Sequence, residues 1–137
     1  MIICENAEFK EAAEFYADKL GIQNDTIIAI VLHNNLEDVL GYCEYHDEDV
    51  LPYYLVGVDT RIEPGLDNPM EVLAHELVHV KQYSRGELVD QGNSCLWYNK
   101  EYAEVVTGSD EYYLSPWEVE AFGKQVGLYR MYLREFF

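Results

Sequence analysis

Basic residues are scarce in this chain, and their scarcity argues against nucleic-acid binding. Its 137 residues include nine Lys and Arg against 26 Asp and Glu, which gives a formal net charge of −17. No basic cluster is present to neutralise phosphates, so we expect no direct contact with nucleic acid. The acidity favours a well-solvated surface. Two alternatives stay open: a preference for cationic partners, and mimicry of DNA by an acidic surface.

Long apolar runs are also lacking. The longest, residues 26–32, has the length of a strand, whereas a membrane-spanning helix needs about 20 apolar residues. The first residues show no basic region followed by a long apolar one, so we expect no secretory signal. Three widely separated cysteines form no C-x-x-C pair: Cys4, Cys43 and Cys95. These absences predict free thiols, no membrane span and a cytoplasmic protein.

The apolar pattern predicts a single α+β domain over residues 1–137. Apolar residues at helical spacing predict a first helix over residues 6–20 and a last helix over residues 116–134. Three strands are expected, over residues 26–33, 39–46 and 53–60, with an acidic hairpin tip at 47–49. A small hairpin is expected from residues 95–98 and 102–106, turning at Asn99–Lys100. No repeat or linker divides these elements, so one layered structure follows.

The strongest functional signal is the segment HELVH, residues 75–79, which is an instance of H-E-x-x-H. Positions i and i+4 of a helix share one face, so His75 and His79 could hold one zinc ion through their imidazole nitrogens. Glu76 follows the first ligand and projects beside the metal, where it can act as general base on an attacking water. The pattern therefore predicts a catalytic zinc site.

The flanking residues place this motif in the middle of a helix. Asn68 suits the N-cap, Pro69 the first helical position, and Glu71 the first turn. Gly86 is a suitable helix stop. A helix with two half-buried histidines and no metal is the alternative interpretation, but the rigid mid-helix position favours zinc.

A catalytic zinc takes three protein ligands, so one more must come from outside the motif. Ser115 to Glu118 has the form of a capping box, in which Glu118 would reach back to the amide of the cap residue. Glu120 has no such task, and it lies about 200° around the helix from Glu118. The small Ala121 beside it allows close helix packing. We therefore predict Glu120 as the third ligand, with Glu118 as the alternative.

The motif helix followed, after about 40 residues, by a helix carrying WEVEAF resembles the gluzincin metallopeptidases. The nearest resemblance is to the minimal minigluzincins and related small bacterial and phage metallopeptidase-like proteins. It implies that His75, His79 and Glu120 bind Zn²⁺ and that Glu76 is the general base. It also implies a zincin-like fold, in which a small, mainly antiparallel or mixed three-stranded sheet packs on the motif helix and a C-terminal ligand helix, with an N-terminal helix added. An edge strand within residues 53–60 would receive extended substrate.

These expectations combine in a zinc metallopeptidase that hydrolyses protein or peptide substrates. Its transition state needs a further oxyanion donor, for which Tyr112 and Tyr113 are the candidates. The alternative is a catalytically silent or latent zinc-binding domain with a regulatory or adaptor role. The motif residue Glu76 favours the enzyme, because a purely structural zinc site needs no free carboxylate beside the metal.

Overall fold

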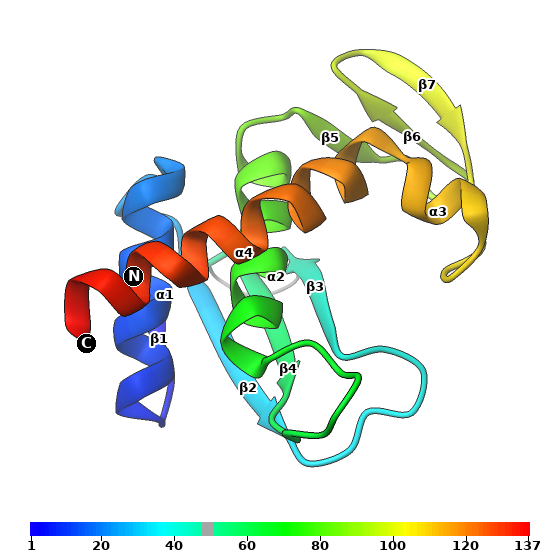
Figure 1. The fold of residues 1–137 in the computed structure, drawn as a ribbon. Coiled ribbons are helices and arrows are strands. Elements are labelled where there is room, and N and C mark those ends of the chain that lie inside the picture. Colours follow the sequence, from blue (N-terminus) through cyan, green and yellow to red (C-terminus); the bar gives the residue numbers. More distant parts are fainter. Residues whose placement is uncertain (48–50) are drawn as a thin grey trace.

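The computed structural model describes residues 1–47 and 51–137 of the chain. Its elements in chain order are β1 (Ile2–Ile3), α1 (Ala7–Leu20), β2 (Ile28–His33), β3 (Gly41–His46), β4 (Tyr53–Asp59), α2 (Pro69–Ser84), β5 (Leu88–Asp90), β6 (Ser94–Trp97), β7 (Lys100–Ala103), α3 (Asp110–Leu114) and α4 (Pro116–Phe136). Helix α2 contacts the main sheet through β3 and β4 and is crossed by α4 (Figure 1). The α+β class is confirmed.

The main sheet is mixed and has the strand order β1-β2-β4-β3. Strand β2 pairs in parallel with β1 and with β4, whereas β3 pairs antiparallel with β4. The sheet therefore has one strand more than predicted, because β1 spans two residues and leaves no pattern in the sequence. The expectation that the strand within residues 53–60 forms the edge is wrong. Strand β4 is internal, and among the described strands β1 and β3 lie at the two edges.

Helix α2 forms the centre of the molecule. Its N-cap is Asn68, whose side chain accepts a hydrogen bond from the Met70 amide at 2.8 Å, and Pro69 occupies the first turn as predicted. The helix ends at Ser84, two residues before Gly86, which has a φ of 71°. Sheet, α1 and α4 all contact α2 and bury it on nearly every side. The motif segment is therefore held in a rigid core.

A second sheet, of order β5-β6-β7, projects from the end of α2 (Figure 1). The predicted hairpin is confirmed as β6 and β7, but its turn lies one residue earlier, at Tyr98 and Asn99. Both residues have a positive φ, of 48° and 68°, as a tight two-residue hairpin turn requires. The β3–β4 pairing agrees with the other predicted hairpin, whose expected tip at 47–49 lies largely outside the described residues.

Two further expectations concern the whole chain. The three cysteines are free thiols, as predicted. In the part of the chain that the structure describes, no helix is both long enough and apolar enough to cross a membrane.

Candidate metal centre

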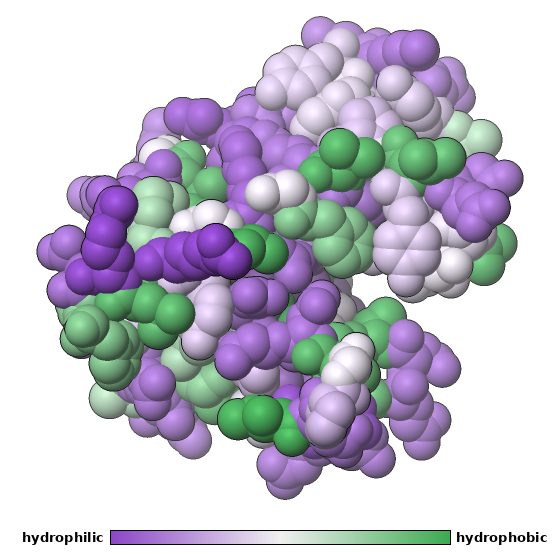
Figure 2. Space-filling view, viewed as in Figure 1, coloured by the Kyte–Doolittle hydropathy of each residue, from purple (hydrophilic) through white to green (hydrophobic). Residues whose placement is uncertain are grey.

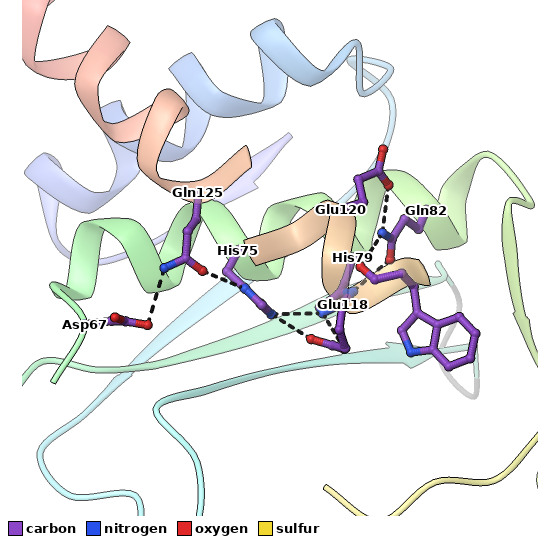
Figure 3. Close-up of polar contacts among 8 residues, drawn as sticks. Asp67, His75, His79, Gln82, Glu118, Glu120 and Gln125 are labelled. Atoms are coloured by element: carbon purple, nitrogen blue, oxygen red, sulfur yellow. Dashed lines mark hydrogen bonds and ion pairs between the residues drawn. The ribbon is translucent and has the colours of Figure 1, made fainter. Parts of the chain in front are cut away.

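Two histidines from α2 and one glutamate from α4 converge in the core (Figure 3). The Nε2 atoms of His75 and His79 lie 3.2 Å apart. The carboxylate of Glu118 faces both rings, with Oε1 3.1 Å from His75 Nε2 and Oε2 3.1 Å from His79 Nε2. The three residues are 6%, 8% and 5% exposed, respectively. This geometry is suited to a metal ion, which would replace direct contacts between the three groups.

The predicted third ligand, Glu120, does not reach this group. Its carboxylate lies on another side of α4 and accepts hydrogen bonds from Lys81 Nζ at 2.8 Å, Gln82 Nε2 at 2.8 Å and Lys124 Nζ at 2.9 Å. The structure thus corrects the choice between the two glutamates in favour of Glu118.

The correction has a physical reason at the start of α4. The capping box is not formed, because the Ser115 hydroxyl instead donates to the Glu111 carbonyl oxygen at 2.8 Å. Helix α3 ends immediately before α4 and supplies that carbonyl, so Glu118 is free to turn inward. The buried stripe of α4 comprises Trp117, Glu118, Ala121, Gln125, Leu128 and Tyr132. The sequence feature that could have identified the third ligand was Glu118, a charged residue within this stripe and close to the small Ala121.

Outer hydrogen bonds determine which ring nitrogen of each histidine faces the centre. Gln125 Oε1 lies 2.8 Å from His75 Nδ1, and Gln82 Oε1 lies 2.8 Å from His79 Nδ1. An amide oxygen can only accept, so both Nδ1 atoms carry a hydrogen, and the Nε2 atoms point at Glu118. Acceptor atoms from three residues then face one another, so protons or a metal ion must lie between them.

The charge of the Glu118 carboxylate dominates the electrostatics of the centre. Burial opposes its ionisation, but hydrogen bonds from both histidines outweigh burial and lower its pKa to about 2. Burial likewise lowers the pKa of His79, yet the bond to Glu118 and the charge of Glu76 raise it to about 9. Glu118 therefore stays ionised, and one positive charge, from a proton or a metal ion, must balance it.

Glu76 is a buried carboxylate beside the group of three. It is 7% exposed and lines a cleft beside His75. Burial raises its pKa; the two histidines lower it, and the charge of Glu118 raises it further. A Cβ on Gly41 of β3 would lie 3.0 Å from Glu76 Oε2 and 2.7 Å from Val72 Cγ1. The edge strand thus approaches α2 so closely that only glycine fits beside this carboxylate.

The cleft has a volume of about 530 Å³ and opens to solvent as the hollow on the right of Figure 2. One wall is formed by residues 36–41, and the opposite wall by Thr107, Gly108, Tyr112 and Tyr113. Tyr112 is the tyrosine nearer the centre: burial, then the charge of Glu118 and a hydrogen bond to it, raise its pKa. Tyr113 is 53% exposed and packs on Phe122. The site therefore has access to a substrate-sized space.

A partly buried ion pair, which the sequence did not indicate, anchors the first wall. The Asp59 carboxylate, at the end of β4, accepts hydrogen bonds from the Leu36 amide at 2.8 Å and from the Arg61 amide at 3.0 Å. Arg61 Nη2 lies 2.9 Å from the same carboxylate. Hydrogen bonds from Arg61 are the main cause of the lowered Asp59 pKa, so the pair stays charged and holds this part of the wall in place.

Comparison of the chain with protein-family models, curated proteins and solved structures found no match. The case for a function therefore rests on the residues of the centre and on the cleft beside it. The decisive features are the donor set His75, His79 and Glu118, and the free carboxylate of Glu76.

Proposed function

We propose that this protein is a zinc-dependent peptidase of gluzincin-like design. The observation that carries the proposal is the position of Glu76 beside a buried His75–His79–Glu118 group, at the wall of an open cleft. Two imidazole nitrogens and one carboxylate are ligands typical of a hydrolytic zinc site. The comparisons neither add to this proposal nor oppose it.

The number of donors favours an enzyme over the catalytically silent alternative. Structural zinc sites take four protein ligands, whereas catalytic sites take three and leave a position open. Among residues 1–47 and 51–137, the candidate group has three members. Glu76 is not a member of this group, and its carboxylate adds a further charge at the wall of the cleft. A structural site would gain nothing from burying this charge.

Glu76 is the residue that handles protons in the proposed hydrolysis. When bound, zinc supplies Lewis acidity, which makes a water nucleophilic near neutral pH and polarises the scissile carbonyl. Glu76 accepts the proton of the attacking water and then delivers it to the leaving amine. Tyr112, which lines the cleft, would donate a hydrogen bond to the developing oxyanion.

The substrate is proposed to bind in an extended form along β3. This strand forms an edge of the main sheet, and its first residue, Gly41, lines the cleft next to Glu76. An edge strand offers backbone donors and acceptors to an added peptide strand. A peptide paired with β3 would pass Glu76 with its backbone carbonyls in reach of the centre.

The proposal is tested by metal content and proteolysis together. Protein purified without chelators is expected to contain about one zinc per chain and to cleave unfolded protein or peptide mixtures, with products identified by mass spectrometry. A chelator should abolish cleavage, and added zinc should restore it. Absence of zinc from protein purified in this way would contradict the whole proposal. Stoichiometric zinc with no cleavage across a broad peptide library would instead favour the regulatory or adaptor alternative.

Tyr112→Phe is expected to lower kcat by about 10²–10³-fold while zinc content stays unchanged, because it removes one oxyanion donor. Tyr113→Phe is the matched control: the same atom is removed one residue away, from a ring that is more exposed. Steady-state kinetics with one fluorogenic peptide would separate kcat from KM. Equal losses in both variants would exclude a specific role for the Tyr112 hydroxyl.

A further inference from the structure

Each histidine of the centre is held by a glutamine, and each glutamine is held by a carboxylate. His79 Nδ1 meets Gln82 Oε1 at 2.8 Å, and Gln82 Nε2 meets Glu120 Oε1 at 2.8 Å (Figure 3). On the other side, His75 Nδ1 meets Gln125, whose Nε2 lies 3.3 Å from Asp67 Oδ2. The donor rings are thus oriented by two chains of polar contacts that run outward from the centre.

The two chains differ in how firmly they fix the amide. Gln82 is fully buried, and its amide donates both to Glu120 and to the Trp117 carbonyl oxygen at 2.9 Å. Its oxygen must therefore face His79, because turning the amide over would place that oxygen against the Glu120 carboxylate and the Trp117 carbonyl oxygen. In the described structure Gln125 has one such acceptor, Asp67, at the longer distance of 3.3 Å. His79 is consequently the more strongly oriented of the two rings.

Glu120 is itself fixed by two lysines. Lys81 Nζ and Lys124 Nζ lie 2.8 and 2.9 Å from Glu120 Oε2, which leaves Oε1 for the Gln82 amide. Two ammonium groups in contact with one carboxylate hold it in the ionised form, and an ionised carboxylate can only accept a hydrogen bond. The Glu120 carboxylate therefore directs the NH₂ group of Gln82 away from His79.

We infer that Glu120 is a positioning residue of the metal centre: through Gln82 it holds His79 in the tautomer whose Nε2 can bind metal. The inference rests on the metal site of the proposed function, but not on its peptidase activity. A partner of this kind typically changes metal affinity by about 10–100-fold when it is lost. Because the Trp117 carbonyl would still hold one hydrogen of the Gln82 amide, we expect the lower end of that range for Glu120.

Glu120→Gln tests the inference, because a glutamine at this position can donate as well as accept and no longer dictates the direction of the Gln82 amide. Glu87→Gln is the matched control. Glu87 Oε1 lies 2.9 Å from the same Lys81 Nζ, so this variant removes an equal charge from the same lysine. In the described structure the Glu87 side chain makes no hydrogen bond to the Gln82 amide.

The zinc Kd, measured by competition with a chromophoric chelator, is expected to rise about tenfold in Glu120→Gln and to stay within about twofold of wild type in Glu87→Gln. In zinc-loaded protein, the His79 Nδ1–H proton should exchange faster with water in Glu120→Gln, as seen by proton–nitrogen NMR. This exchange reports the orientation of the ring, and general loss of stability would not single it out.

Thermal unfolding of metal-free samples checks that all the proteins are folded. Equal zinc Kd and equal proton exchange in wild type and Glu120→Gln would overturn the inference while leaving the peptidase proposal intact. Equal weakening of zinc binding in Glu120→Gln and Glu87→Gln would also overturn the inference, because the loss of a charge beside Lys81 would then explain the weaker binding. A wild-type protein that binds no zinc would overturn both proposals together.

Discussion

Glu118→Ala is expected to weaken zinc binding by more than about 100-fold, beyond the usual range for loss of an outer hydrogen-bond partner. The variant removes one of the three donors of the buried group. It also leaves His75 and His79 facing each other at 3.2 Å with no carboxylate to balance a cation. Competition with a chromophoric chelator measures the loss directly, and circular dichroism checks that the variant is folded.

Glu120→Ala is the natural comparison for Glu118→Ala, since both glutamates lie in the first turns of α4 and both are ionised. It is expected to retain zinc with a Kd raised by about 10–100-fold. The decisive result is which of the two variants loses more zinc affinity. If Glu120→Ala lost more affinity than Glu118→Ala, the assignment of the third donor would have to be reversed.

Glu76→Gln is expected to lower kcat by about 10²–10⁴-fold, the usual contribution of a general acid–base residue, while the protein keeps its zinc. The amide is nearly isosteric with the carboxylate, so it should fit in the tight space beside Gly41. It cannot accept the proton of the attacking water. Elemental analysis and steady-state kinetics on one sample give both quantities.

Glu135→Gln is a suitable control for Glu76→Gln. Glu135 is exposed near the end of α4 and does not line the cleft. It carries the same change of charge, and its activity should match wild type. Full activity in Glu76→Gln would exclude a role for this residue as general base. Loss of zinc in that variant would show instead that Glu76 supports metal binding.

Local rules were sufficient to predict α2 and the position of His75 and His79 on one face of it. The Asn68 cap, the proline after it and the i, i+4 spacing all act within a few residues, so they can be recognised without knowledge of the tertiary structure. The third donor depended on a contact between helices. Ser115 had two possible uses, as a cap of α4 or as a donor to α3, and the choice depended on a short helix that the sequence did not indicate.

The edge of the sheet could not be predicted for a similar reason. Strand length and alternation identified β2, β3 and β4 within about two residues, which is the usual accuracy for element ends. The order of the strands across the sheet depends on which strands pair, and the sequence of β4 gives little indication that this strand is central. One indication is Gly57, whose missing Cβ leaves room for the Tyr42 ring of the neighbouring strand. A glycine inside a strand indicates such a close approach.

The separation of the donors along the chain links metal binding to folding. His75 and Glu118 are 43 residues apart, and the second sheet and α3 lie between them in sequence. An unfolded chain would have to close this loop before the donors could meet, so the intact group belongs to the folded state. A metal that binds it at a concentration 100 times its Kd would add about 2.7 kcal/mol to the free energy of unfolding. The joining of α2 to α4 would then depend on metal supply as well as on apolar packing.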